Sequence, residues 1–515
     1  MIFLQQLKDK KFVVLICFIV LKFLLQYSLI SADYDLQRDE FLHLEQAHHL
    51  SWGYLSVPPF TSWVSVIIFY LGNTIFWIKF FPALFGALTI LLVWKSIEEL
   101  NGNFFALILG ATGLLFSSLL RLNTLFQPNS FDVLSWTAIY FVLIKYIKTK
   151  HIQWLYIGAV VCALGFLNKY NIIFLFIGLL PAILLTQQRK IFAQKHFYFS
   201  ILLALLLISP NLIWQYNNDF PVVYHLKELV DTQLVNVNRL DFLKNQLLFF
   251  YGVLFVIIAA LYALLFYKPF KPYQLFLFSL IFTLVAFIYF KAKDYYAIGL
   301  YPIYVGFGAA YLGKLLDTGW RRYLQPIAIV LPILLFIPFY KIAFPNKSPQ
   351  YIAAHARPYK AVGLLRWEDG KDHELPQDFA DMLGWKSLAL LVDSISATLP
   401  NPRQAMILCD NYGQAGAINY YTTNKKIAAS AFDADYVNWL QLNKKTTDVI
   451  LVKESGEEDP GRTTEIPLFD TVYLAGKRIN KFAREKEISI YVLRGAKVDI
   501  NKRIKDEADR EKQHQ

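Results

Sequence analysis

The sequence predicts an α-helical polytopic membrane protein of about eleven spans, followed by a soluble α/β domain. Hydrophobic residues make up 56% of the 515 residues and the mean hydropathy is +0.37, whereas a soluble domain is about 45–50% apolar. Apolar runs of membrane-spanning length recur as far as residue 343, and charge rises beyond that point. We therefore expect a membrane domain over residues 1–343 and a soluble domain over residues 344–515.

The spans are predicted from run length, because a transmembrane helix needs about 20 apolar residues, within a range of roughly 17–25. Most of the runs have this length. Two shorter ones, Trp154–Leu167 and Ile172–Leu185, form either two spans or a re-entrant pair. The eleven runs are Phe12–Ile30, Ile78–Trp94, Phe104–Leu120, Phe131–Ile147, Trp154–Leu167, Ile172–Leu185, Phe197–Trp214, Leu247–Tyr267, Leu275–Phe290, Ala297–Leu316 and Leu324–Ala343.

The distribution of charge predicts the orientation, because lysine and arginine are enriched in cytoplasmic loops. With the N-terminus inside, inner segments contain basic clusters such as Lys145–Lys150 and Arg189–Lys195, while most acidic residues of the membrane half fall in outer segments. The formal charge of +12 therefore reflects topology and contact with membrane lipids, and no nucleic-acid partner is expected. The three cysteines predict no disulfide framework.

The C-terminal region has the pattern of a small α/β domain. Ala405–Cys409 and Asp448–Val452 are short apolar runs typical of buried strands, and Gly413–Tyr421 is expected to be helical. Thr471–Leu474 and Ile488–Leu493 are further strand candidates. The charged stretch Lys502–Gln515 is expected to fray, and an odd number of spans places this domain outside.

The first outer loop, residues 31–76, contains two adjacent carboxylates at Asp39 and Glu40. In a helix neighbouring side chains point about 100° apart, so one carboxylate would face a site and the other would support it. His43 lies four residues after Asp39, on the same helical face. The alternative is a solvated loop at a membrane surface. The following segment, Phe41–Leu55, has the composition of an amphipathic helix lying on the outer interface.

Further charged residues lie at the outer ends of predicted spans. Asp132 begins a span at a helix N-terminus, where the helix dipole favours a negative charge, so a structural role explains it well. Several bases run against the usual charge bias, and anionic phosphate groups are natural partners for them. The alternative is that they snorkel to lipid headgroups. These bases are Lys79, Arg121, Lys169, Lys291 and Lys293.

Several classes of chemistry have no support in the sequence. There is no glycine-rich nucleotide loop of the Rossmann or P-loop kind, so a nucleotide-driven reaction is not expected. No Gly-x-Ser-x-Gly motif indicates a serine hydrolase. The histidines show no zinc-type spacing and there is no clear Asp-x-Asp pair, so no cofactor is certain and use of a divalent metal is left open.

Together these segments resemble membrane glycosyltransferases of the GT-C superfamily, in particular the bacterial proteins similar to protein O-mannosyltransferases and to the lipid A aminoarabinose transferase. The resemblance keeps the order of the motifs over most of residues 30–305. The segments that carry it are Asp39–Phe41 with Trp52–Tyr54 and Pro58-Pro59, Gln127–Asp132 with Trp136, Leu167–Tyr170, Pro210–Trp214, Lys293–Tyr296 with Tyr301-Pro302, and Asn411–Ala417.

This resemblance implies transfer of a hexose or pentose from a polyprenyl-phosphate carrier to an acceptor hydroxyl, with inversion at the anomeric carbon. It implies a multi-pass protein of the inner membrane whose active site and C-terminal domain face the periplasm. The acceptor is a glycan, a lipid or a protein. Asp39 corresponds to the catalytic base, with Glu40 as its neighbour or alternative.

The resemblance also implies the positions of the binding residues. The leaving phosphate gains charge and needs cations, for which the outer bases Lys169, Lys291, Lys293, Arg121 and Lys79 are the candidates. The supporting candidates are Asp132, His43, Tyr170, Tyr295, Tyr296 and His225.

A lipid-linked sugar transporter or flippase is the alternative from another class. Transporters place charged sites near the middle of the bilayer. Here Lys22 is the plainest mid-span charge, whereas the acidic residues gather at one face. That asymmetry favours an outward-facing enzyme.

Overall fold

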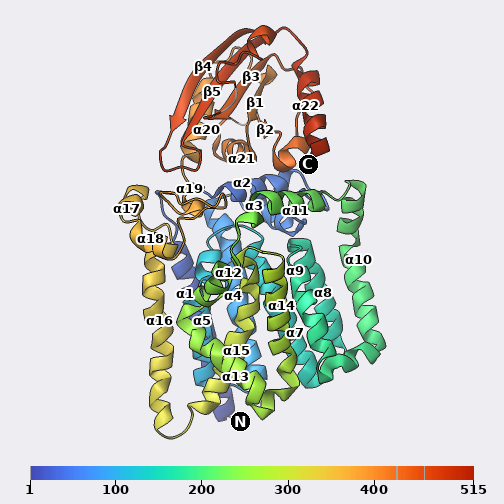
Figure 1. Cartoon of the computed structure of the whole chain (residues 1–515), viewed down its shortest axis with the longest axis vertical. Helices are drawn as coiled ribbons and strands as arrows, with labels where there is room; N and C mark the ends of the chain where they lie inside the picture. The colour runs from blue at the N-terminus through green and yellow to red at the C-terminus, as the bar shows by residue number, and fades with distance from the viewer. Residues whose placement is uncertain (1, 425–426, 457–458, 515) are drawn as a thin grey trace.

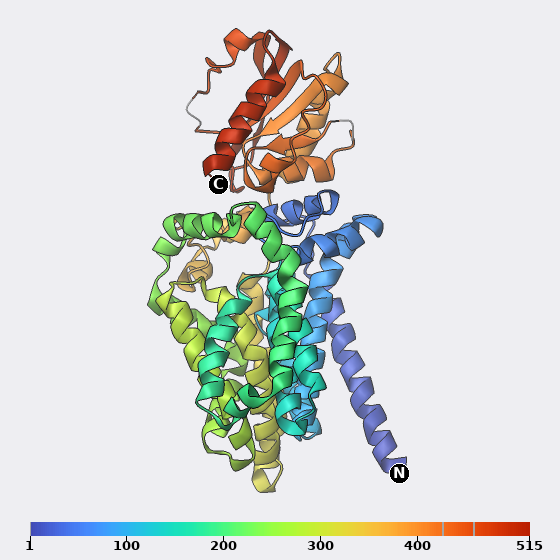
Figure 2. The same cartoon turned by 90° about the vertical axis from the view of Figure 1, so that its right-hand side faces the viewer.

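The computed structural model describes residues 2–424, 427–456 and 459–514. The chain forms a long helical bundle with an α/β domain docked on one end (Figures 1 and 2). The N-terminus lies at the opposite end of the bundle. We call the end that carries the α/β domain the domain-facing end. At this end the α/β domain packs on the loops and short helices that connect the spans.

Each of the eleven predicted apolar runs overlaps a long helix of the bundle. By length and composition, six helices in the described part of the chain can cross a membrane, or up to eight if each of two bent pairs is one span, so the count of eleven stays a prediction. The helices are α1 (Ile2–Ser28), α4 (Ile75–Glu99), α5 (Phe104–Leu115), α7 (Asn129–Thr149), α8 (Gln153–Asn168), α9 (Ile172–Leu184), α10 (Lys195–Asn217), α13 (Leu254–Phe266), α14 (Gln274–Tyr289), α15 (Tyr301–Leu315) and α16 (Leu324–Ala343).

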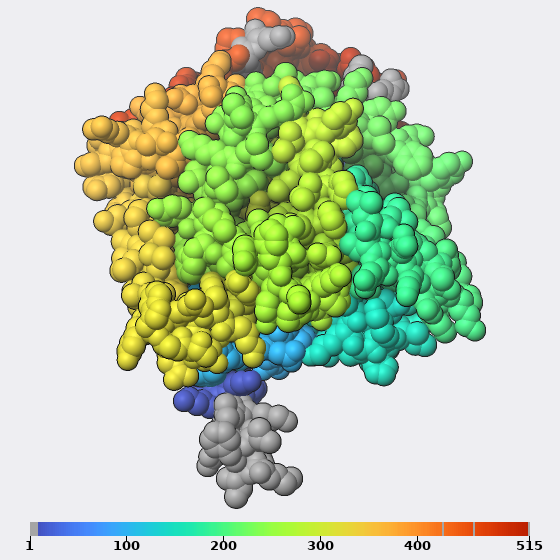
Figure 3. Space-filling view, turned by 60° about the horizontal axis from the view of Figure 1, so that its bottom comes forward, coloured from blue at the N-terminus to red at the C-terminus, as the bar shows by residue number. Residues whose placement is uncertain are grey.

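Small residues let the bundle helices approach closely. A side chain at Gly308 of α15 would lie 1.9 Å from the carbonyl oxygen of Val256 on α13, and one at Gly178 of α9 would lie 1.9 Å from the hydroxyl of Thr283 on α14. In a bilayer the helices gain little from excluding lipid, so such close packing stabilises the bundle. The two short runs become α8, which packs on α7 and α10, and α9, which packs on α14. In Figure 3, α9 (teal) lies beside the helices drawn in yellow-green.

The far end of the bundle is basic, as the orientation argument expects. Lys145 and Lys148 both lie near the end of α7, and their ammonium groups are 2.7 and 3.1 Å from the carboxylate of Glu99 at the end of α4. The outer surface of α10 is apolar, with Leu202, Leu206 and similar side chains exposed. An apolar belt above a basic rim is the surface expected of a protein that spans a membrane.

The domain-facing end is built from short helices that lie across the tops of the spans (Figure 2). They are α2 (Arg38–Glu45), η1 (Gln46–His48), α3 (Phe60–Tyr70), α6 (Leu119–Leu122), α11 (Pro221–Thr232) and α12 (Arg239–Phe249). After α16 the chain continues through α17 (Pro349–Ala354), α18 (Arg357–Ala361) and α19 (Gln377–Ala380) into the α/β domain. Residues 366–381 of this connection lie close to the tops of the spans.

The expected amphipathic helix over residues 41–55 was wrong in its length. The α-helix ends at Glu45 and a single 3₁₀ turn ends at His48. The residues that follow form a loop because the α/β domain provides its hydrogen bonds: the carboxylate of Asp435 accepts from the backbone N–H of Leu55 at 2.8 Å and from the side chain of Gln46 at 3.3 Å. A partner distant in sequence therefore replaced the helical hydrogen bonds.

The α/β domain contains one mixed sheet in the order β2-β1-β3-β5-β4. The first three of these are parallel neighbours, and β5 runs antiparallel between β3 and β4. All the predicted strands and the predicted helix are present. The elements are α20 (Trp385–Ser396), β1 (Ala405–Cys409), α21 (Tyr412–Tyr421), β2 (Ala429–Ala431), β3 (Asp448–Glu454), β4 (Phe469–Ile479), β5 (Glu487–Ala496) and α22 (Ile500–His514).

The expectation that residues 502–515 fray was wrong as far as residue 514. This stretch forms α22, which packs on the sheet through buried Ile500 and Ile504. Its apolar residues recur at helical spacing, which outweighs the high charge of the segment. Residue 515 lies outside the described residues.

One hydrophobic core joins the bundle to the α/β domain. Phe41 of α2 and Ile78 of α4 belong to the same buried cluster as Trp385 of α20 and Ile418 of α21. The ring of Phe41 makes edge contact with the ring of Trp385, at 6.2 Å between centroids. Helix α2 therefore lies between the bundle and the α/β domain, and its apolar residues pack in the core that joins them.

Candidate active site

Helix α2 turns its two adjacent carboxylates in different directions, as helical geometry predicted. Its start is capped by Gln37, whose side-chain oxygen accepts from the N–H of Asp39 at 2.8 Å. In return, the carboxylate of Glu40 accepts from the backbone N–H of Gln37 at 2.9 Å. This reciprocal cap fixes the first turn, and with it the directions of both carboxylates.

Glu40 points into the bundle and is fully buried. The ammonium of Lys79 donates to its two oxygens at 2.6 and 2.8 Å, and the N–H of Phe126 donates at 2.7 Å. With Gln37, these donors occupy the lone pairs that a carboxylate offers. Glu40 is therefore neutralised and closed to a substrate, and so is Lys79, which the sequence had offered as a phosphate ligand.

Asp39 points toward the α/β domain and is half-buried. The hydroxyl of Tyr412 on α21 donates to one of its oxygens at 2.7 Å, and the side chain of Gln127 donates to the other at 3.0 Å. Among the described residues no cation lies within ion-pair distance of Asp39. Its partners are neutral donors, and the carboxylate has lone pairs left for an incoming hydroxyl.

Lys169, in the loop after α8, is linked to Asp39 through two amide side chains. Its ammonium donates to Asn129 at 2.6 Å, Asn129 donates to Gln127 at 3.0 Å, and Gln127 donates to Asp39. The same ammonium lies 4.3 Å from the ring centre of Tyr296. Among the described residues no carboxylate lies within ion-pair distance of Lys169, although the carboxylate of Asp132 is near enough to interact with its charge. The aromatic face and one amide oxygen hold Lys169 in place.

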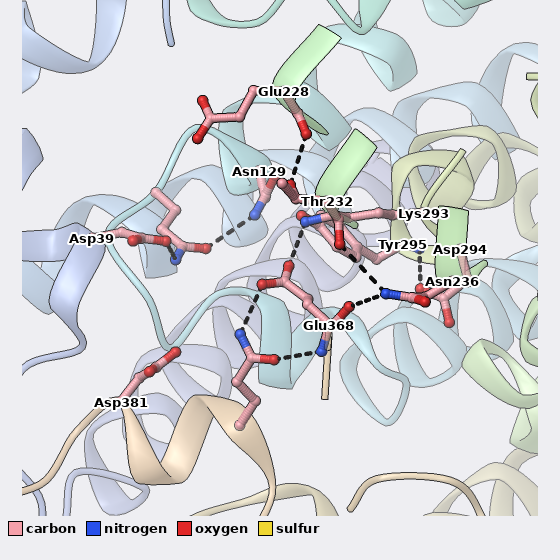
Figure 4. A network of polar contacts seen from close by, with 12 residues as sticks. Asp39, Asn129, Glu228, Thr232, Asn236, Lys293, Asp294, Tyr295, Glu368 and Asp381 are labelled. Carbon is pink, nitrogen blue, oxygen red and sulfur yellow. Dashed lines mark hydrogen bonds and ion pairs between the residues drawn. The ribbon is translucent and has the colours of Figure 1, made fainter. Parts of the chain in front are cut away.

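Lys293 lies nearby and forms an ion pair with Glu368 of the connection between the bundle and the α/β domain (Figure 4). Glu368 also accepts from Gln377 at 2.8 Å. Burial opposes the charge on Lys293, but Glu368 outweighs burial and raises the pKa of Lys293, with a smaller contribution from Asp39. The ammonium is therefore charged and belongs to the electrostatic surroundings of Asp39.

The remaining predicted cations differ in their surroundings. Arg121 pairs with Asp378 at 3.0 Å and donates to Thr124 at 2.6 Å. Lys291 is half-exposed and has a left-handed backbone with a φ of +51°. Its side chain makes no hydrogen bond or ion pair with any residue in the described ranges. Lys169 is thus linked to Asp39 through amide side chains and Lys293 acts on it electrostatically, whereas Arg121 and Lys79 are paired with carboxylates elsewhere.

Two of the predicted supporting residues, Asp132 and His43, are buried and contact neighbouring side chains. Asp132 is buried in the first turn of α7, as predicted, where Trp136 and Asn171 each donate to it at 2.9 Å. His43 is buried with its ring edge against Phe126, 6.5 Å away, and it makes no hydrogen bond to Asp39. Both side chains hold neighbouring segments in place.

The aromatic candidates and His225 line the side of the site that carries the lysines. Tyr295 and Tyr296 stack edge to face at 4.8 Å beneath Lys169. Tyr170 donates to Asn211 at 3.1 Å and so joins α8 to α10. His225 lies on α11, where burial first and then the charge of Lys293 lower its pKa.

Acidic side chains gather between Asp39 and the α/β domain. Burial raises the pKa of Asp381 to about 7, against the opposing effect of Arg484, which donates to it at 3.2 Å. Arg38 lies over the ring of Tyr412 at 4.4 Å.

In the parts of the chain that the structure describes, no cluster of three or more histidine, cysteine, aspartate or glutamate side chains could hold a metal ion.

The residues that sequence reasoning missed are the neutral partners of Asp39 and the carboxylate partner of Lys293. Tyr412 and Gln127 lie inside motifs that carried the family resemblance, so the signal was present but had no role attached. Glu368 had no such signal. Its pairing with Lys293 depends on how residues 366–381 fold back over the bundle (Figure 4).

Comparison with known proteins shows which proteins the chain is similar to. The family model described as dolichyl-phosphate-mannose-protein mannosyltransferase matches residues 56–214. The crystal structure of ArnT from Cupriavidus metallidurans bound to undecaprenyl phosphate superposes with a TM-score of 0.60 at 12% identity, over 93% of this chain and 97% of that chain. The chain resembles the GT-C membrane glycosyltransferases. The resemblance expected from the sequence is thus confirmed.

The apo form of ArnT from the same organism superposes with a TM-score of 0.57, again at 12% identity and over 93% of this chain and 97% of that chain. At this identity the likeness establishes a shared fold. No curated protein matches the chain by sequence. The family match begins at residue 56, after Asp39, and includes Lys79, Arg121, Gln127 and Lys169.

Proposed function

We propose that this protein transfers a sugar from a polyprenyl-phosphate-linked donor to an acceptor hydroxyl. The observation that carries the proposal is the linkage of a half-buried carboxylate, Asp39, to Lys169 through Gln127 and Asn129; among the described residues, no carboxylate lies within ion-pair distance of this lysine. A base and a phosphate-binding cation on one framework are what this reaction requires. The match to mannosyltransferases and the ArnT-like fold supply the class of donor.

The proposed reaction is a direct displacement at the anomeric carbon. Asp39 accepts the proton of the acceptor hydroxyl while that oxygen bonds to the anomeric carbon. The bond between this carbon and the phosphate oxygen breaks, and its electron pair leaves with the polyprenyl phosphate. The sugar passes through an oxocarbenium-like transition state, and one displacement inverts its configuration. Lys169 stabilises the charge that grows on the leaving phosphate, assisted by Lys293.

The proposal includes a place in the cell. The basic rim formed by Lys145 and Lys148 lies at the end of the bundle away from Asp39, which under the positive-inside rule is the cytoplasmic end. The active site and the α/β domain then face the periplasm. The membrane region 1–343 binds the donor, and the soluble region 344–515 closes the site. The acceptor is a glycan, a lipid or a protein.

Lys22, the one feature that suggested a transporter, has a structural explanation. It is buried on α1, and its ammonium donates to Gln26 at 2.8 Å and to Asn123 at 2.9 Å. These two amide oxygens accept hydrogen bonds from the ammonium and so stabilise its charge in the space between the helices. Lys22 therefore needs no transported ligand.

The test is sugar transfer by the purified protein and its Asp39→Asn variant. A panel of radiolabelled polyprenyl-phosphate sugars serves as donors, with lipid A, lipid-linked glycan and hydroxyl-containing peptides as acceptors. The wild type should transfer one of the sugars, and the variant should be about 10²- to 10⁴-fold slower at unchanged thermal stability. Transfer at the wild-type rate by Asp39→Asn refutes the base. If neither protein transfers sugar but lipid-linked sugar crosses vesicles containing the protein, transport replaces transfer.

A further inference from the structure

The α/β domain contributes a side chain to the candidate active site. Tyr412, the first residue of α21, lies 373 residues after Asp39 in the sequence, yet its hydroxyl donates to the carboxylate of Asp39 at 2.7 Å. Among the described residues, two side chains donate hydrogen bonds to the carboxylate of Asp39: Gln127 belongs to the bundle and Tyr412 to the α/β domain. The environment of the proposed base is therefore complete only when the α/β domain is docked.

The start of α21 is anchored so that the Tyr412 ring has little freedom. Asn411 caps the helix by accepting from the N–H of Gln414 at 3.1 Å, and Asn411 itself donates to Glu485 at 2.9 Å. The N–H of Tyr412 donates to Asp433 at 3.2 Å. These contacts belong to the α/β domain alone. The domain thus presents the tyrosine from a rigid helix start rather than from a loop.

Close packing of α21 on α2 then sets the distance between the two residues. A side chain at Gly416 would lie 2.6 Å from the Cβ atom of Phe41, and one at Gly413 would lie 3.3 Å from the Cβ atom of Arg38. Larger residues at these positions would push the helices apart. The two glycines in the segment Asn411–Ala417 therefore let Tyr412 reach Asp39.

Burial and the nearby charge of Asp39 keep the hydroxyl of Tyr412 protonated, so this hydroxyl remains a hydrogen-bond donor. Burial, followed by the charge of Asp39, raises the pKa of Tyr412 well above its usual value. The guanidinium of Arg38 covers the face of its ring at 4.4 Å. The hydroxyl therefore stays protonated across the working pH range, and a donor to a carboxylate favours the charged form of that carboxylate.

We propose that Tyr412 is a positioning residue for the transfer reaction: it holds the carboxylate of Asp39 in one orientation, so that docking of the α/β domain completes the active site. This inference rests on the proposed function. With one oxygen held by Tyr412 and the other by Gln127, the remaining lone pairs of Asp39 have fixed directions. The acceptor hydroxyl then meets an oriented base.

The experiment is the pH dependence of transfer by Tyr412→Phe, with the sugar donor that the wild type uses. Loss of one hydrogen bond to a charged group should lower kcat about tenfold to hundredfold. The acidic limb of the kcat/KM profile should move to higher pH, because the ionised carboxylate loses a donor. The donor KM should change little, because the variant leaves Lys169 and Lys293 untouched.

Tyr420→Phe is the matched control. Tyr420 lies on the same helix and at the same interface, but its hydroxyl donates to the carbonyl of Asn73 at 3.1 Å and not to Asp39. This variant should keep the wild-type pH profile. A double variant, Asp39→Asn with Tyr412→Phe, should be no slower than Asp39→Asn alone, because the tyrosine acts through the carboxylate.

Two results overturn the inference while leaving the proposed function intact. One is a Tyr412→Phe variant with the wild-type kcat and pH profile. The other is a loss of rate with an unchanged pH profile that adds to the effect of Asp39→Asn, which would show a purely structural role. Absence of transfer by the wild type overturns the proposed function itself, and the inference with it.

Discussion

The two faces of α2 show how neighbouring residues of the same chemistry acquire different roles. On the bundle side, Glu40 is buried and bound by Lys79 and two backbone N–H groups. On the side of the α/β domain, Asp39 is half-buried and bound by neutral donors. A carboxylate paired with a buried lysine stabilises the fold, whereas one held by neutral donors has no counter-charge bound to it and keeps free lone pairs. The partner decides the role, and not the residue type.

The cations repeat this contrast. Lys79 is tied to Glu40 and Arg121 to Asp378, whereas Lys169 is held by an amide oxygen and an aromatic ring. Lys293 is intermediate, because its partner Glu368 is partly exposed and comes from the connection to the α/β domain. The structure therefore separates cations that hold the fold from those that remain able to bind a phosphate.

The largest expected effect tests the structural side of this comparison. Glu40→Gln leaves Lys79 buried without a counter-charge, and should lower the free energy of unfolding by about 3–5 kcal/mol. Thermal unfolding of the purified protein in detergent measures it, with Asp39→Asn as the matched control that should unfold like the wild type. A stable but inactive Glu40→Gln protein would contradict this assignment, because it would mean that Glu40 acts in the reaction and does not stabilise the fold.

The next effect tests the catalytic side. Lys169→Ala removes the cation that is linked to Asp39 through amide side chains, so kcat/KM for the donor should fall about tenfold to hundredfold, as expected for loss of a charged hydrogen bond. The KM for the acceptor should stay within about twofold of the wild type. Lys244→Ala, at an exposed lysine of α12, is the control. Equal donor kinetics for wild type and Lys169→Ala would remove Lys169 from the phosphate site.

The smallest effect concerns the intermediate case, Lys293. If the donor phosphate displaces Glu368 from this lysine, Glu368→Gln should lower the donor KM about twofold to fivefold. A change of this size corresponds to the free energy of a partly exposed ion pair. Asp372→Asn, which removes an exposed partner of Lys360, serves as the control. A higher donor KM in Glu368→Gln would mean instead that Glu368 orients Lys293 for binding.

Elements with a local signature were predictable from the sequence. The apolar runs became helices, and the short apolar strands and the helix at Tyr412–Tyr421 were found where expected, because hydrophobic periodicity is read over a few turns of chain. The divergence of Asp39 and Glu40 also followed from helical geometry alone. Two of the predicted cations are connected to Asp39, Lys169 through two amide side chains and Lys293 electrostatically, and their role in phosphate binding stays a prediction.

Errors arose where a distant segment provided the hydrogen bonds. Residues after His48 have an amphipathic composition, yet Asp435 binds their backbone and holds a loop. The charged C-terminal stretch packs on a sheet formed by strands far from it in the sequence. In both places local composition was outweighed by tertiary contacts.

The sequence by itself determined the class of fold, the two-part organisation and the carboxylate-bearing first loop, because these depend on hydrophobicity and short-range spacing. Only the tertiary structure decided which carboxylate is tied to Lys79, which lysine is linked to Asp39 through amide side chains, and that Tyr412 reaches Asp39. The physical reason is that a buried charge or polar group must find a partner within about 3 Å. That partner is selected by how helices and domains pack.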